Sequence, residues 1–325
     1  PYTLWVATLY QDELRAKADQ EDGWAKGVLN SPPWPLLLAQ ERLALRRAGR
    51  ILALSPHTAE RIQTLLPEAA DRIETVLYPI DLEAFKPDDV ARQQSPYGRY
   101  LFLAARINDP RKNVGMLLDA FRLIHEQQPD LKLVMSGELP NHSLGRQASD
   151  LGLDDVIVFL GPVEKDELIR LYQGAELFVL PSLQEGLGIV VLEALACGTP
   201  VVATRCGGPE GIVIEGQTGI LVDDRHDPAA FAQAVLDLLT QPDQLEALRI
   251  SSAAHARQHF AEAVIAAQIK RAYQHIGHHP PHPLPIFRAA AVAWAVIIFG
   301  FYMFQQLRLR WPAIQSQLID PIWGG

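Results

Sequence analysis

Short apolar runs alternate with longer amphipathic stretches through the first 276 residues. Residues 3–9 and 51–54 have the length and composition of buried strands, and residues 36–48 have the periodicity of a helix. Ser55 and Pro56 form a typical helix start, so a second helix is expected from about His57. Strands that alternate with helices predict a parallel α/β sheet. About three strands are few for such a sheet, which suggests, with the start at Pro1, that part of an N-terminal domain is missing.

A polar linker over residues 93–98 leads into a second, longer series of the same kind. Its first helix is expected over residues 114–125, where one face is apolar. The apolar runs of strand length lie at residues 100–104, 131–135, 156–160, 175–180 and 201–203. The predicted fold class is therefore α/β with two parallel-sheet domains. The expected divisions are a partial domain over 1–90, a second domain over 91–257 and a further helix over 258–276.

The segment from Pro181 to Val202, PSLQEGLGIVVLEALACGTPVV, combines a strand end, a glycine loop and a helix. Gly186 and Gly188 form a loop whose backbone is able to approach a ligand closely. A helix is expected from Leu187 to Cys197, followed by another strand. This order places the N–H groups of a helix start at the carboxyl edge of a parallel sheet, where anions and nucleotides bind.

Two carboxylates bracket the expected start of that helix, Glu185 in the loop and Glu193 inside the helix. Eight residues at about 100° each place two helical side chains on adjacent faces, so both carboxylates are expected to face one cleft. Two ordinary surface glutamates are the simpler alternative. Glu193 argues against that alternative, because a carboxylate among apolar neighbours is costly unless it has a partner.

The whole segment resembles the E-x7-E signature of the retaining nucleotide-sugar glycosyltransferases of family 4, which have the two-Rossmann GT-B fold. The proline, the serine, both glutamates, the glycines and the GTPVV ending match that signature. The resemblance covers roughly residues 50–276 and is strongest over residues 100–222. It implies an enzyme that moves a sugar from a nucleotide-diphosphate donor to an acceptor hydroxyl with retention of the anomeric configuration.

Arg106 and Lys112 follow the first strand of the second domain. Two cations beside a helix start suit a diphosphate, because Arg grips it through two N–H groups and Lys adds a point charge. A solvated basic loop is the alternative, since Arg111 lies there too. The spacing R-x5-K-N matches the diphosphate-binding pair of the family.

The resemblance assigns a role to each residue of the expected site. Arg106, Lys112 and Glu185 would form the catalytic set, in which Glu185 holds hydroxyls of the transferred sugar. Glu193 would hold the ribose hydroxyls. The rest of the donor site would be Gly186, Leu187 and Gly188 in the loop, with Gly137 and Val163 at two strand ends.

No metal or other cofactor is expected, and the nucleotide-sugar is the substrate. Arg106, Lys112 and the helix start near Gly186 would stabilise the charge that develops on the leaving diphosphate. The sequence has no Asp-x-Asp motif beside a strand end that would hold Mg²⁺ or Mn²⁺. The net charge of −9 argues against a nucleic-acid partner, which calls for a basic face. Two cysteines, Cys197 and Cys206, favour a reducing, cytoplasmic compartment over a disulfide framework.

Tyr10 is a departure from the family pattern. In many members a histidine follows the strand that VATL resembles, and it contacts the donor sugar. Tyr10 stands there, either as a sugar contact or packed at a strand end. The alternative function is therefore a catalytically inactive module that binds a sugar nucleotide and is tethered to a membrane or a partner. A scaffold without donor affinity is a third reading.

The last part of the chain lies beyond the family resemblance. Residues 277–285 are rich in histidine and proline and are expected to be a solvated spacer. Residues 286–306 include a run of sixteen residues without a charge, from Ala289 to Phe304, close to the length of about 17–25 that spans a bilayer. A transmembrane or membrane-associated helix is favoured over a buried or interfacial one. Membrane attachment would suit a glycan or lipid-linked acceptor.

Overall fold

The computed structural model describes residues 2–19, 23–31 and 34–274. The spacer 277–285 and the apolar stretch 286–306, for which membrane attachment is expected, lie outside the described residues. Within the ranges that are described, no helix combines the length and the hydrophobicity needed to cross a membrane.

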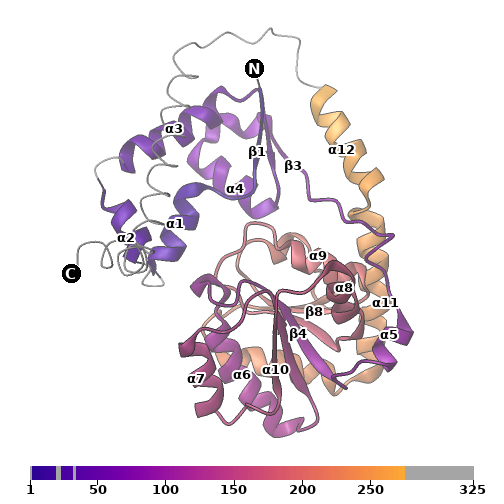
Figure 1. The fold of residues 1–325 in the computed structure, drawn as a ribbon. Helices are drawn as coiled ribbons and strands as arrows, with labels where there is room; N and C mark the ends of the chain where they lie inside the picture. The colour runs from indigo at the N-terminus through magenta and orange to yellow at the C-terminus, as the bar shows by residue number, and fades with distance from the viewer. Residues whose placement is uncertain (1, 20–22, 32–33, 275–325) are drawn as a thin grey trace, which may run out of the picture. The chain divides into compact units, whose positions relative to one another are not determined.

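The prediction of parallel α/β sheets is confirmed, and the first of them is the N-terminal sheet (Figure 1). Among the described residues its strands are β1 (Thr3–Val6), β2 (Arg50–Ala53) and β3 (Ile73–Thr75), in that order. The helices of this part are α1 (Tyr10–Asp19), α2 (Gly23–Leu29), α3 (Trp34–Arg47) and α4 (Pro56–Leu65). Ser55 caps α4 as the sequence predicts, because its hydroxyl accepts a hydrogen bond from the N–H of Thr58.

The expectation of a buried strand over residues 3–9 is wrong in length and in burial. β1 ends at Val6, and Tyr10 already begins α1. In the described part of the chain, β1 pairs with β2 along one of its edges, and Trp5 is 42 % exposed. An apolar run predicts a strand, but it does not show whether that strand lies at the centre or at the edge of a sheet.

The C-terminal sheet is larger, and all its described neighbouring strands are parallel. The strand order is β6-β5-β4-β7-β8-β9. The strands are β4 (Tyr100–Ala104), β5 (Lys132–Ser136), β6 (Ile157–Gly161), β7 (Leu177–Leu180), β8 (Val201–Thr204) and β9 (Gly219–Val222). Every residue of β4, β7 and β8 is buried, as strands covered on both faces require.

Helices cover both faces of the C-terminal sheet (Figure 1). One group packs together as α6 (Val114–Gln127), α7 (His142–Asp150) and α10 (Pro228–Leu239). The other group is α8 (Lys165–Gly174), α9 (Ile189–Ala196) and α11 (Pro242–His259), with α5 (Asp89–Gln93) beside α8. α12 (Glu262–Gln274) returns to the N-terminal sheet, where Ile265 and Ala272 pack against Leu52 and Val76.

The helix expected over residues 187–197 begins two residues later, at Ile189. Gly188 precedes it with a φ of 81°, a left-handed conformation that residues with a side chain rarely adopt. The loop therefore extends through Gly188, and the N–H groups at the start of α9 directly follow it.

Candidate functional site

The strand order of the C-terminal sheet reverses between β4 and β7, which are neighbours near its centre. Ligands of open parallel sheets bind outside the carboxyl ends of the two strands at such a switch point. Here those ends lead into the loops 105–113 and 181–188, which contain the predicted cation pair and the predicted glycine loop. The topology thus brings the two motifs to one edge of the sheet.

The loop after β4 is tied to the loop after β7 by hydrogen bonds. Asp109 caps the short 3-10 helix Pro110–Lys112, and Asn113 follows it in a left-handed conformation with a φ of 54°. The side-chain amide of Asn113 donates to the backbone oxygens of Pro181 and Arg225 at 3.2 and 2.8 Å. This link sets the positions of the two loops relative to each other.

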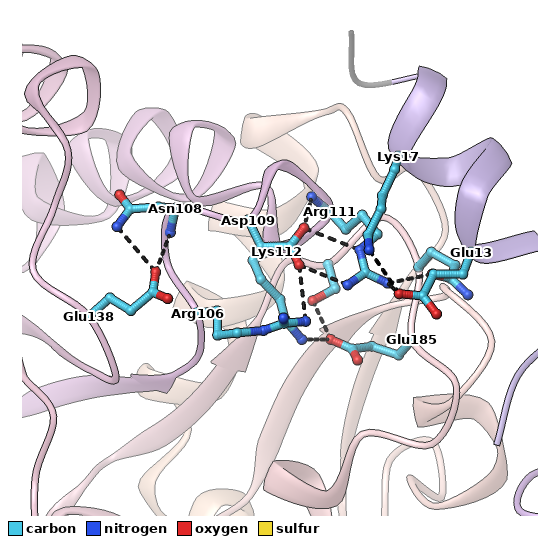
Figure 2. A network of polar contacts seen from close by, with 11 residues as sticks. Glu13, Lys17, Arg106, Asn108, Asp109, Arg111, Lys112, Glu138 and Glu185 are labelled. Carbon is cyan, nitrogen blue, oxygen red and sulfur yellow. Dashed lines mark hydrogen bonds and ion pairs between the residues drawn. The ribbon is translucent and has the colours of Figure 1, made fainter. Parts of the chain in front are cut away.

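Lys112 and Glu185, predicted from separate motifs, form an ion pair (Figure 2). Lys112 Nζ lies 2.6 Å from Glu185 Oε1, and Ser182 donates its hydroxyl to the same oxygen at 2.7 Å. Both charged side chains are mostly shielded, with 16 % and 12 % of their surfaces exposed. Shielding from solvent strengthens the attraction between the two charges, which fixes Lys112 and Glu185 relative to each other.

Arg106 lies in the same loop as Lys112 (Figure 2), but its side chain is much more exposed to solvent. Its side chain is 64 % exposed, and its Nη2 lies 3.1 Å from Oδ2 of Asp109. A guanidinium carries five N–H donors, so most of them are not used by this contact. Arg106 is therefore well placed to bind an incoming anion.

Arg111 is not the solvated surface charge that the alternative reading of this loop supposes. It is 8 % exposed. It donates two hydrogen bonds to Asp109, from Nε to Oδ1 at 3.1 Å and from Nη2 to Oδ2 at 2.8 Å. Its Nη1 lies 3.3 Å from Glu13 of α1 and 3.3 Å from Gln184. The loop after β4 is thus built around a buried arginine. Sequence patterns do not reveal its burial, because two of its partners, Glu13 and Gln184, are remote in the chain.

The glycines of the loop after β7 allow close approaches that a side chain would prevent. A Cβ at Gly186 would stand 2.7 Å from the backbone oxygen of Ala7. Leu187 between the two glycines is buried, and Gly188 has the left-handed conformation described above. At the start of α9 the loop therefore offers backbone N–H groups to a ligand.

Glu193 has a different setting from Glu185, because it lies inside α9 and contacts a phenol. Tyr172 of α8 donates its hydroxyl to Glu193 Oε2 at 2.7 Å. Burial raises the pKa of Glu193, while the hydrogen bond from Tyr172 lowers it in part. Tyr172 is the partner that a carboxylate among apolar residues requires. The sequence did not single it out, since a tyrosine on an amphipathic helix reads as an ordinary core residue.

Two more strand ends frame the same edge of the sheet. Gly137 follows β5 with a φ of 124°, and a Cβ there would stand 2.1 Å from the backbone oxygen of Ala105. Val163 follows β6 and packs, half-buried, against the core of the C-terminal sheet. Asn108, which sequence reasoning missed, donates its amide to Glu138 Oε2 at 3.1 Å and so links the loops after β4 and β5.

Tyr10 begins α1 and remains 42 % exposed. Its backbone N–H donates to Glu41 Oε1 at 2.6 Å, and its ring centroid lies 6.2 Å from that of Trp34. Burial, together with the charges of Glu13 and Glu41, raises the pKa of Tyr10. Its hydroxyl is therefore a neutral hydrogen-bonding group at physiological pH.

In the part of the chain that the structure describes, no three His, Cys, Asp or Glu side chains are grouped as ligands for a metal ion. Cys197 and Cys206 are free and buried.

Solved structures with a similar fold include GT-B glycosyltransferases. A sucrose-phosphate synthase from Thermosynechococcus elongatus superimposes with a TM-score of 0.65 at 26 % identity, covering 77 % of this chain and 64 % of that one. The glycosyltransferase WaaG gives a TM-score of 0.67 at 19 % identity, covering 85 % and 75 %. HepE from Anabaena, in complex with UDP, gives 0.67 at 22 % identity, covering 84 % and 78 %. The fold is therefore GT-B.

The family model "Glycosyl transferases group 1" matches residues 86–255, just over half of the chain. The protein belongs to this family. A D-inositol 3-phosphate glycosyltransferase from Pseudarthrobacter chlorophenolicus is 34 % identical over 215 residues, which are 62 % of this chain and 51 % of that protein. One from Corynebacterium urealyticum is 40 % identical over 46 % of this chain and 36 % of that protein. The chain spans about half the length, or less, of these curated relatives.

Proposed function

We propose that the protein is a retaining glycosyltransferase that moves a sugar from a nucleotide-diphosphate donor to an acceptor hydroxyl without a metal ion. The observation that carries this proposal is the Lys112–Glu185 pair, which lies with Arg106 at the switch point of the C-terminal sheet. Two cations, Arg106 and Lys112, beside the carboxylate of Glu185 suit a ligand in which a diphosphate is joined to a sugar. Family membership supports the same reaction class.

In this proposal the charges of the loop after β4 act on the leaving group. The bond between the anomeric carbon and the β-phosphate oxygen breaks, and negative charge develops on the diphosphate. Arg106, Lys112 and the N–H groups at Gly186, Leu187 and Gly188 stabilise that charge. The acceptor oxygen forms the new bond to the anomeric carbon on the face that the diphosphate leaves, and its proton passes to the oxygen of the departing diphosphate.

The remaining residues bind the donor. Glu185 accepts hydrogen bonds from hydroxyls of the transferred sugar, and Glu193 accepts them from the ribose. Gly137 and Val163 lie against the base, largely through backbone and apolar contacts. Tyr10 contacts the sugar through its hydroxyl, in the place where many family members have a histidine.

The test is donor turnover by the full chain in buffer with EDTA. UDP-sugars come first, because the structurally similar HepE is known in complex with UDP and with UDP-glucose, and GDP- and ADP-sugars follow. Release of the nucleoside diphosphate by the wild type is expected, with loss of release in Arg106→Ala and Glu193→Ala. Turnover that requires a divalent cation would contradict metal independence.

A second candidate is a binding module that does not turn over its donor, and Tyr10 is the observation that favours it. The two candidates differ in one result: tight donor binding with no release, even with acceptor extracts, would support the module. Tyr10→His and Tyr10→Phe extend this test. Turnover gained in Tyr10→His would show that the tyrosine at this position prevents turnover in the wild type.

The acceptor is proposed to be a glycan or lipid-linked hydroxyl, with the catalytic part in the cytoplasm and attached to the membrane through residues 286–306. The curated relatives are named for inositol 3-phosphate, so this polyol phosphate belongs in the acceptor screen. Deletion of residues 284–325 tests the attachment. Unchanged fractionation of the truncated protein between membrane and soluble fractions would rule it out.

A further inference from the structure

Arg106 and Arg111 both contact one carboxylate, that of Asp109 (Figure 2). Arg111 engages both oxygens, with Nε 3.1 Å from Oδ1 and Nη2 2.8 Å from Oδ2. The Nη2 of Arg106 lies 3.1 Å from the same Oδ2. Arg111 therefore uses the two-point geometry that guanidinium and carboxylate groups favour, and Arg106 is left with a single shared oxygen.

The settings of the two arginines suit different tasks. Arg111 is buried, and further contacts with Glu13 and Gln184 fix it in place. Its backbone oxygen also accepts a hydrogen bond from the N–H of Leu183 at 2.7 Å. Arg106 is exposed and has one ion pair among the described residues. Because Arg111 is fixed on Asp109, the exposed Arg106 is free to exchange that carboxylate for another anion.

Asp109 is an anion under ordinary conditions. Burial opposes its ionisation, but the hydrogen bonds and the charge of Arg111 hold the pKa of Asp109 below its usual range. An ionised carboxylate within reach of Arg106 competes with a diphosphate for that arginine. The strength of this competition depends on how much of the carboxylate Arg111 occupies.

We propose that Arg111 is a positioning residue for donor binding, because it occupies Asp109 and so keeps that carboxylate from immobilising Arg106. Glu13 of α1 contributes to the same function, since it holds the Nη1 side of Arg111 from the N-terminal part of the chain. The inference rests on the proposed binding of a nucleoside diphosphate at Arg106. It assigns a role in that site to Arg111, Asp109 and Glu13, none of which needs to touch the donor.

The contribution of Glu13 is smaller than that of Asp109. Glu13 is half-buried and also pairs with Lys17 at 3.0 Å. Its contact with Arg111 is a single one at 3.3 Å, against the two-point contact with Asp109. Loss of the Glu13 charge should loosen Arg111 without releasing Asp109.

The experiment measures the dissociation constant of UDP by titration calorimetry for the full chain and for Arg111→Met, Asp109→Asn/Arg111→Met, Glu13→Gln and Arg122→Met. Arg111→Met is expected to weaken UDP binding about tenfold, because Asp109 then captures Arg106 with both oxygens. The double variant is expected to return to within about threefold of the wild type, since a neutral amide no longer competes for Arg106. Arg122, an exposed helix residue paired with Glu126, is the matched control and should change nothing.

The rescue by Asp109→Asn tests whether the uncompensated charge of Asp109 causes the weaker binding, because a neutral amide does not compete for Arg106. A loss of shape would instead lower the stability of Arg111→Met together with its affinity. Thermal unfolding of each variant is recorded beside the titration. If Arg111→Met does not fold, Glu13→Gln tests the same inference, with an expected weakening of about threefold. UDP binding that is unchanged in Arg111→Met, or that is not restored in the double variant, would overturn the inference alone. A wild type that binds neither UDP nor any other nucleoside diphosphate would overturn the proposed function as well.

Discussion

Glu185 and Glu193 lie eight residues apart in one segment, yet the structure gives them opposite environments. Glu185, in the loop, pairs with the cation of Lys112 and accepts from Ser182. Glu193, in the helix, has the neutral hydroxyl of Tyr172 as its partner, within an aromatic cluster that includes Phe102 and Phe178. The loop side of the site is thus organised by charge, and the helix side by burial. A single motif supplies two carboxylates with different chemical properties.

The largest effect is expected from breaking the charged side of this comparison. Lys112→Ala removes the cation that pairs with Glu185, and in the proposed function this cation stabilises charge on the leaving diphosphate. A loss of about 10²-fold or more in kcat is expected, the range found for removing one preorganised donor to a developing anion. Steady-state release of UDP from the donor measures it. Equal kcat values for Lys112→Ala and for the surface variant Arg122→Ala would show that Lys112 does not act on the transition state.

A smaller effect is expected from moving the loop without changing its charge. Gly186→Ala places a methyl group 2.7 Å from the backbone oxygen of Ala7, so the loop or the end of β1 must shift. A displacement of this size near reacting groups should lower kcat/KM by about tenfold or more. Gly145→Ala in α7, where nothing lies within 4 Å, is the matched control. Similar kinetics for the two variants would mean that the Gly186 contact has no bearing on the site.

On the helix side, Tyr172→Phe sharpens the comparison through pH. The tyrosine hydroxyl lowers the pKa of Glu193 against the larger effect of burial. Without this hydroxyl the pKa of Glu193 rises further. As the pH is lowered, the ionised carboxylate, which in the proposed function accepts from the ribose, is therefore lost at a higher pH. Donor affinity should fall most at low pH, where more of this carboxylate is protonated in the variant, by up to about tenfold for each unit by which the pKa rises. The pH at which affinity is half-maximal should move upward. A uniform loss at every pH would instead indicate a packing defect.

The smallest effect is on stability, and its sign follows from the raised pKa of Glu193. Burial raises the pKa of Glu193 in the folded state above its ordinary value of 4.5. Between the ordinary pKa and the raised pKa, which bound the relevant pH window, the folded state binds more protons than the unfolded state. The free energy of unfolding therefore falls across the window. Glu193→Gln removes this pH-dependent loss of stability. At pH values above the window the variant should be more stable than the wild type by about 1 kcal/mol or less, while it binds the donor more weakly. Denaturant titrations at several pH values measure it, with Glu126→Gln as an exposed control.

The sequence predicted the parts of this site that depend on local order. The strands of the C-terminal sheet and the glycine loop before α9 follow from short-range patterns of apolar, polar and glycine residues, as does the cap of α4 by Ser55 outside the site. The end of β1 does not. Arg106, Lys112 and the two glutamates are predicted from their match to the motifs of the family, and their roles stay predictions. The structure places Lys112 and Glu185 in contact and gives Glu193 a different partner, Tyr172.

The parts that were not predicted depend on contacts between distant segments. Arg111 looked like a loop charge, because nothing near it in the sequence points to Glu13 or Gln184 as partners. Tyr172 precedes Glu193 by 21 residues and reaches it through the packing of α8 on α9. The exposure of Trp5 in β1 likewise depends on what covers the strand, which an apolar run does not encode.

A structure of the protein with UDP would test the central claim most directly. The account predicts that the diphosphate contacts the guanidinium of Arg106 and Nζ of Lys112, and that the ribose hydroxyls donate to the carboxylate of Glu193. It also predicts that Arg106 has left Asp109 while Arg111 still holds it. UDP bound away from the ends of β4 and β7, or with Arg106 still on Asp109, would contradict the account.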